Sequence, residues 1–168
     1  MKWFLGFLVL LLVIVNCNHF LFFNFFTHSL PHGIYLRTGG APQRGDYAVS
    51  CLTPQIARYG IERGYLVEGY CETGSVPVLK IIKGMPGDNF MIKNGYFVLN
   101  GIEYPIVARD STGRPLKAFY AGSGGVLEKN KYLLISTFAK NSWDGRYWGG
   151  VAIKYIVKPL WILDHEKN

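Results

Sequence analysis

The chain of 168 residues is long enough for one domain with a substantial core and too short for two large ones. Hydrophobic residues make up 49% of it and charged residues only 17%, which argues against an intrinsically disordered protein. The net charge of +7 is not concentrated in any basic run, so we expect no nucleic-acid partner.

A long apolar segment opens the chain. Apolar residues run without a break over residues 3–15, and the apolar character resumes over residues 20–26. Such a segment can cross a bilayer as a helix of about 20 residues. We therefore predict a membrane anchor over residues 1–26 and a folded domain over residues 27–168. A cleavable signal peptide is the competing interpretation, but residues 16–26 lack the small side chains of a cleavage site.

The rest of the sequence has the pattern of a mainly β domain. Short apolar runs alternate with Gly, Asn and Pro, and the pairs Asn94-Gly95 and Asn100-Gly101 predict tight turns between strands. The best helical candidate covers residues 54–68, with a Pro near its start and apolar side chains at turn spacing. We expect a mainly β fold with one or two short helices.

The cysteines and histidines give no sign of a metal site. Cys51 and Cys71 lie in the predicted domain, where a disulfide is possible if the domain is exported, although two reduced thiols fit the sequence nearly as well. The four His residues are scattered and no CxxC or HExxH motif is present. We therefore predict no metal and no cofactor.

Lys80 interrupts an otherwise apolar predicted strand. Alternation places Val78, Lys80 and Ile82 on one face, so the ammonium points where the apolar side chains point. Desolvation lowers the pKa of a Lys, and a neutral Lys can accept a proton. The ordinary alternative is a Lys on an edge strand whose ammonium reaches water, and this strand alone favours that alternative.

A second polar stretch, NSWDGRYWGGV, begins at residue 141. Asp144 and Arg146 are close enough in sequence to pair, and Ser142 lies beside them. A surface turn with a weak ion pair is the ordinary interpretation. The aromatic residues that flank the pair indicate a more buried position.

Together these stretches resemble the successive motifs of the type I signal peptidase family. The corresponding segments are SLPHG from Ser29, Arg44-Gly45-Asp46, LKIIKGMPGD around Lys80 and NSWDGRYWG from Asn141. The resemblance runs from residue 27 to about residue 151, and its most specific parts are GMPGD and the NSxDxRYxG spacing. Within the family the chain is most similar to the small conjugative-transfer peptidases of the TraF type, which mature pilin subunits. The resemblance implies a compact signal-peptidase-like β-barrel or sandwich domain behind one N-terminal transmembrane helix.

The resemblance also implies a serine endopeptidase with a Ser/Lys dyad. Ser29 matches the nucleophile and Lys80 the general base that takes its proton. Thr27 matches the residue whose hydroxyl joins the Ser29 backbone N–H in the oxyanion hole. Lys83 lies three residues after Lys80, but its place in the strand points it the other way.

Three more residues receive supporting roles from the family motif. Ser142 matches the residue that orients the Lys amine. Asp144 and Arg146 match a pair that holds this turn in place.

A nucleophile just beyond the anchor implies a location and a substrate. It places the protein in the bacterial inner membrane, in contact with its lipid, as a single-pass protein with a periplasmic catalytic domain. The expected partner is a membrane-inserted precursor protein, which binds extended beside a strand. We predict a conjugative pilin, and nothing in the sequence separates hydrolysis from cyclisation. The alternatives are a general type I signal peptidase and a non-catalytic, membrane-tethered β-domain scaffold.

Overall fold

The computed structural model describes residues 6, 20–25, 27, 29–120, 122–139 and 141–163. Most of the predicted anchor over residues 1–26 lies outside these described residues. Among the residues that are described, no helix is both long enough and apolar enough to cross a bilayer.

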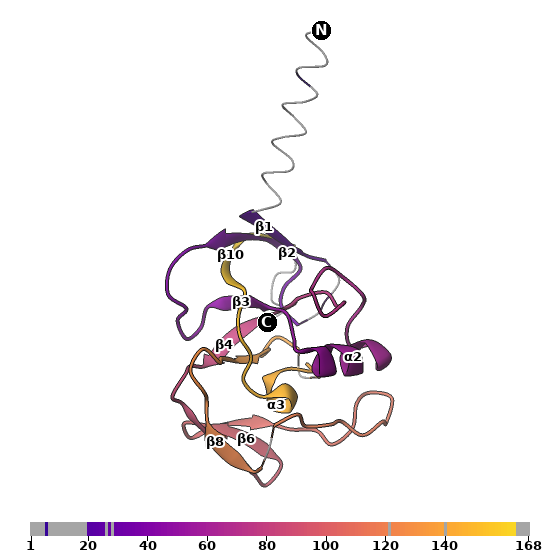
Figure 1. Ribbon diagram of the computed structural model, residues 1–168, viewed down its shortest axis with the longest axis vertical. Helices are drawn as coiled ribbons and strands as arrows, with labels where there is room; N and C mark the ends of the chain where they lie inside the picture. The colour runs from indigo at the N-terminus through magenta and orange to yellow at the C-terminus, as the bar shows by residue number, and fades with distance from the viewer. Residues whose placement is uncertain are drawn as a thin grey trace.

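The larger of two sheets carries both ends of the described domain. Its strand order is β1-β2-β10-β3-β4-β9, and every neighbouring pair is antiparallel. The last strand of the sequence, β10, lies between β2 and β3 (Figure 1). The strands are β1 (Leu21–Asn24), β2 (Gly33–Thr38), β3 (Tyr47–Ser50), β4 (Val78–Gly84), β9 (Leu133–Ile135) and β10 (Tyr155–Ile162).

Residues 21–24, which the prediction placed in the anchor, belong to this larger sheet. They form β1, and Phe22 of β1 is buried opposite Tyr35 of β2. An apolar strand next to another apolar segment of the sequence has no compositional boundary, so hydropathy alone could not separate the two. The folded part therefore includes residues upstream of residue 27.

A smaller sheet lies at the end of the domain remote from β1 (Figure 1). Its order is β7-β6-β5-β8, and the strands are β5 (Asn89–Lys93), β6 (Tyr96–Leu99), β7 (Ile102–Pro105) and β8 (Gly124–Val126). Asn94-Gly95 joins β5 to β6 and Asn100-Gly101 joins β6 to β7, all four residues having positive φ as tight hairpin turns require. Both predicted turns are confirmed.

Two short helices complete the described elements. Helix α2 (Pro54–Glu62) begins where predicted but ends earlier than residue 68, because the chain reverses at Gly64, where φ is +73°. Leu66 then folds back against Gly60, where a Cβ atom would come within 2.8 Å of its side chain. Helix α3 (Gly145–Trp148) is a single turn that lies wholly within the NSWDGRYWGGV stretch. The predicted mainly β fold with one or two short helices is confirmed.

The alternation predicted for β4 is also confirmed. Val78, Lys80 and Ile82 are all buried, and Val78 and Ile82 belong to the same core cluster. Leu79 packs in a different cluster on the opposite face of the sheet. The fold therefore sends one Lys side chain into an apolar layer.

A disulfide joins Cys51 to Cys71, 20 residues apart in sequence. It connects the segment before α2 to the loop that carries Tyr70. The sequence left open whether these thiols are paired, and in the structure they are.

Candidate active site

Ser29 lies in the loop between β1 and β2, which is held from two sides. On one side the side-chain amide of Asn24, at the end of β1 and 3% exposed, donates hydrogen bonds to the carbonyl oxygens of Leu30 and Pro31, each at 3.1 Å. On the other side the hydroxyl of Ser136 donates to the carbonyl oxygen of Ser29. The loop is therefore fixed to both β1 and the segment after β9.

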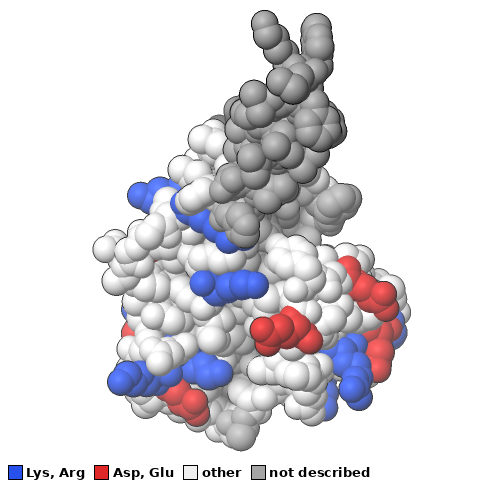
Figure 2. All heavy atoms as spheres, turned by 45° about the horizontal axis from the view of Figure 1, so that its top comes forward, with Lys and Arg blue, Asp and Glu red and all other residues white. Residues whose placement is uncertain are grey.

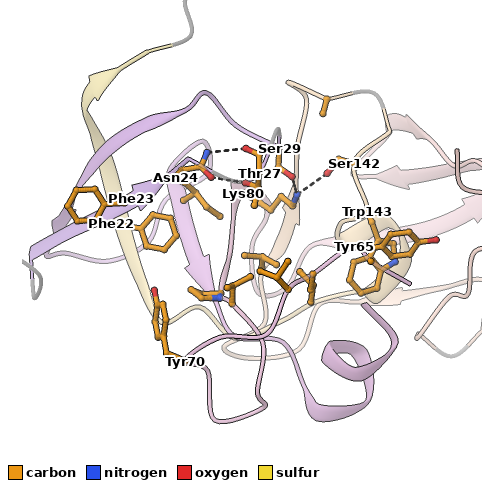
Figure 3. Close-up of a pocket in the computed structure, with 18 of the residues that line it drawn as sticks. Phe22, Phe23, Asn24, Thr27, Ser29, Tyr65, Tyr70, Lys80, Ser142 and Trp143 are labelled. Carbon is orange, nitrogen blue, oxygen red and sulfur yellow. Dashed lines mark hydrogen bonds between the residues drawn. The ribbon is translucent and has the colours of Figure 1, made fainter. Parts of the chain in front are cut away.

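Lys80 of β4 reaches Ser29 from the other half of the larger sheet, with β10 and β3 between β2 and β4. Its Nζ is hydrogen-bonded to the Oγ of Ser29 and donates to the Oγ of Ser142 at 3.0 Å (Figure 3). Only 4% of Lys80 is exposed. Burial lowers the pKa of Lys80 from its ordinary value of 10.5 to about 8; the carboxylate of Asp144 opposes this shift and the guanidinium of Arg146 adds to it. Buried apolar surroundings thus make deprotonation of this amine accessible near neutral pH.

Asp144 and Arg146 form a buried ion pair beneath the turn that carries Ser142. Two guanidinium nitrogens of Arg146 donate to the two oxygens of Asp144, at 2.8 and 3.0 Å. Arg146 also donates to the carbonyl oxygen of Ser142 at 2.9 Å, and the backbone N–H of Ser136 donates to Asp144 at 3.0 Å. Because Asp144 is fully buried and Arg146 is 5% exposed, the weak surface pair considered from the sequence is the wrong interpretation.

Thr27 lies two residues before Ser29, with its hydroxyl turned toward Asn24. Its Oγ1 donates to the Oδ1 of Asn24 at 2.7 Å. The side chain is half-buried and lines the same cleft as Ser29. In this structure the hydroxyl proton of Thr27 therefore points to the amide oxygen of Asn24. A role in an oxyanion hole, as predicted, requires that proton to turn away from Asn24.

The remaining family motifs serve the fold. Arg44 pairs with Asp88 at 2.8 Å, which joins the Arg44-Gly45-Asp46 motif to the end of the GMPGD motif. Asp88 also accepts from the backbone N–H of Met85 at 2.6 Å. The backbone oxygen of Lys83 accepts from Arg44, and the Lys83 side chain does not line the cleft.

Two residues that contact the loop with Ser29 were missed by the sequence analysis. Asn24 counted only as a polar interruption of an apolar segment, and Ser136 belongs to no motif. An Asn inside an apolar run is a usable sequence signal, because an amide that the fold buries there needs several hydrogen-bond partners. No local signal marks Ser136, because its partners Ser29 and Asp144 are brought to it by the tertiary fold.

Ser29 and Lys80 line a cleft of about 780 Å³. Its walls come from β1, the segments around residues 64–67 and 76–79, and the turn with Ser142 and Trp143. Figure 3 shows Ser29, Lys80 and Ser142 along one side, with Phe22 at one end and Trp143 at the other. A long, largely apolar cleft of this kind suits an extended peptide. In the part of the chain that the structure describes, no group of His, Cys, Asp or Glu could hold a metal ion.

A comparison with protein families identifies the chain. The model of the family described as "Signal peptidase, peptidase S26" matches residues 1–159. The chain belongs to this family. The resemblance predicted from the motifs is therefore confirmed, and the dyad-like pair and the cleft lie in the fold of a peptidase family.

Named relatives come from plasmid transfer systems. A plasmid transfer protein TraF of Escherichia coli is 30% identical over 142 residues, which cover 80% of this chain and 79% of the relative. A conjugal transfer protein TraF of Agrobacterium tumefaciens (strain 15955) is 34% identical over 89 residues, 53% of this chain and 49% of the relative.

The crystal structure of a signal peptidase I from Enterococcus faecalis V583 aligns with a TM-score of 0.39 at 15% identity, covering 72% of this chain and 100% of that one.

Proposed function

We propose that this protein is a serine endopeptidase in which Ser29 is the nucleophile and Lys80 the general base. The observation that carries the proposal is the hydrogen bond between a buried Lys80 Nζ and Ser29 Oγ. With the pKa of Lys80 lowered to about 8, about one molecule in ten carries a neutral amine at pH 7. That fraction is sufficient for a base, because the best catalytic pKa lies near the working pH.

The proposed reaction begins with proton transfer. Ser29 Oγ–H gives its proton to the neutral Nζ of Lys80 while Oγ forms a bond to the carbonyl carbon of the scissile peptide. The tetrahedral intermediate collapses, the C–N bond breaks, and the leaving nitrogen takes the proton from Lys80. Water, or the amino terminus of the same substrate, then attacks the acyl ester on Ser29, and Lys80 again takes and returns the proton.

The surrounding hydrogen bonds suit this sequence of steps. Ser142 Oγ holds the amine of Lys80 at 3.0 Å, so the lone pair of the neutral amine can face Ser29. Thr27 stabilises the oxyanion in this proposal, together with the backbone N–H of Ser29. For that, the hydroxyl proton of Thr27 turns from Asn24 to the oxyanion in the transition state.

We assign the pilin of a conjugation system as the substrate. Support comes from the TraF relatives, whose names refer to plasmid and conjugal transfer. The protein then acts as a single-pass inner-membrane enzyme with a periplasmic catalytic domain. The Cys51–Cys71 disulfide supports an oxidising compartment such as the periplasm.

The test is the intact mass of the pilin encoded nearby, co-expressed with the wild type, Ser29→Ala or Lys80→Ala. Only the wild type should trim the pilin, and the loss of one further water would indicate cyclisation. Ser111→Ala and Lys93→Ala are matched controls, because both residues are exposed and outside the cleft. Equal trimming by all five proteins would refute the Ser/Lys assignment. If none trims the pilin, the masses of secretory precursors decide between a general signal peptidase and a scaffold.

A further inference from the structure

The cleft continues past the dyad to a cationic side chain. Arg37 of β2 lines the same cavity as Ser29 and Lys80 and is half-buried. Its guanidinium carbon lies 3.9 Å from the ring centroid of Tyr155, and its Nη2 donates to the Tyr155 hydroxyl at 3.2 Å. These contacts fix the guanidinium in one orientation at the wall of the cleft.

The charge of Arg37 is not balanced by a carboxylate among the described residues. Its Nε is buried without a hydrogen-bond partner. Burial raises the pKa of Tyr155 to about 12, so the hydroxyl that it contacts stays neutral. The ion pairs of the described residues are Arg44–Asp88, Arg114–Asp110 and Arg146–Asp144. A half-buried cation with only neutral partners is unfavourable unless an anion completes the site.

The sheet register gives the distance from Arg37 to the nucleophile loop. Gly33 lies opposite Asn24, the residue whose amide holds that loop. Arg37 is four residues further along β2, about 13 Å at the usual rise of a strand. An extended peptide has a similar rise, so a group bound at Arg37 lies about four residues from the scissile bond.

We propose that Arg37, oriented by Tyr155, binds a carboxylate of the peptide substrate about four residues from the bond that is cleaved. This inference rests on the proposed peptidase function. A guanidinium can donate two parallel N–H groups to one carboxylate, which neither Lys nor a neutral side chain can match. The carboxylate belongs either to an Asp or Glu side chain or to the free carboxyl terminus of a peptide that ends there.

The test uses fluorescent decapeptides with a central Ala-Ala bond, in which Glu or Gln occupies each other position in turn. Their binding to the full-length Ser29→Ala chain in detergent micelles is followed by fluorescence anisotropy. At one position about four residues from Ala-Ala, the Glu peptide should bind about tenfold more tightly than the Gln peptide, as expected of a charge-assisted hydrogen bond. In Arg37→Gln the ratio of the Gln to the Glu dissociation constant should fall to about one. In Arg37→Lys, which keeps the cation, it should fall to an intermediate value.

Arg58→Gln is the matched control, because Arg58 is exposed on α2 and outside the cleft. It should leave the Glu/Gln ratio unchanged. Peptides that end at the preferred position, with a free or an amidated terminus, separate the two sources of the carboxylate. A ratio near one at every position, or a ratio that survives in Arg37→Gln, would overturn the proposal.

Cleavage of the same peptides by the wild type separates this inference from the proposed function. Cleavage without any preference for Glu would keep the peptidase and remove the role of Arg37. Binding with a Glu preference but no cleavage would keep the carboxylate site and count against the peptidase.

Discussion

Replacing Lys80 by Met should make the folded protein more stable at neutral pH while removing the proposed base. Burial lowers the pKa of Lys80 from 10.5 to about 8. One unit of pKa corresponds to about 1.4 kcal/mol, so holding this ammonium in the folded protein costs about 3 kcal/mol at pH 7. Met has a similar length and no charge. Ser29 and Ser142 each lose a hydrogen bond worth about 1 kcal/mol, which leaves a net gain of about 1 to 2 kcal/mol.

The difference in free energy of unfolding between wild type and Lys80→Met should depend on pH, and this dependence is more diagnostic than its size. Between about pH 8 and pH 10.5 the folded wild type has lost the proton of Lys80 and the unfolded chain still holds it. The free energy of unfolding of the wild type therefore rises with pH across this window. Lys80→Met has no amine at this position, so its free energy of unfolding does not show this rise. The advantage of the variant should shrink by about 3 kcal/mol between these two pH values and change sign near the middle of this range, at about pH 9.

Urea unfolding of the full-length chain in detergent micelles, followed by Trp fluorescence at several pH values, measures this difference. Lys83→Met is the matched control, because it removes one cation from the same strand outside the cleft. The comparison with this variant separates the effect of a buried amine from the loss of one charge. A difference between wild type and Lys80→Met that is constant from pH 7 to pH 10.5 would refute the argument.

Four further predictions concern activity and stability. Cleavage should increase with pH and level off above about pH 8, because the base must be neutral; a kcat/KM that falls over this range would exclude Lys80 as the base. Replacing Cys51 and Cys71 by Ser should lower the free energy of unfolding by about 3 kcal/mol, and an unchanged melting temperature would contradict this. Asn24→Ala should reduce kcat more than it raises KM, because the amide holds the nucleophile loop, and equal effects on both would argue against that role. Thr27→Val should lower kcat about 100-fold if the hydroxyl stabilises the oxyanion, whereas Thr27→Ser should retain activity.

The sequence predicted those features that depend on local pattern. Alternation along one strand put Lys80 on the apolar face, although the strand alone favoured an ammonium that reaches water, and burial of Lys80 shows that this alternative was wrong. The Asn-Gly pairs were enough to place two hairpin turns. The family motifs named Ser29, Ser142 and Asp144, which the structure brings to one end of β4. The strand and turn predictions succeeded because periodicity and turn chemistry act over a few residues, whereas the site residues came from the family resemblance.

Features that depend on tertiary contacts could not be predicted. Ser136 contacts Ser29 across 107 positions of sequence, and no local pattern encodes that distance. That Arg37 has no carboxylate partner among the described residues emerges only from the folded structure, which places it against Tyr155. The exposure of the Asp144–Arg146 pair was open for the same reason, since burial is decided by what the rest of the chain places over the turn.

The position of β10 in the middle of the larger sheet has a consequence for biogenesis. The hairpin β1–β2 brings Ser29, the pair β3–β4 brings Lys80, and in the sheet the two are connected only through β10, the last strand to be synthesised. Contacts between segments so far apart in sequence form late in folding. A nascent chain therefore holds Ser29 and Lys80 in separate strand pairs, and under the proposed function the emergence of β10 would act as a built-in delay on proteolysis.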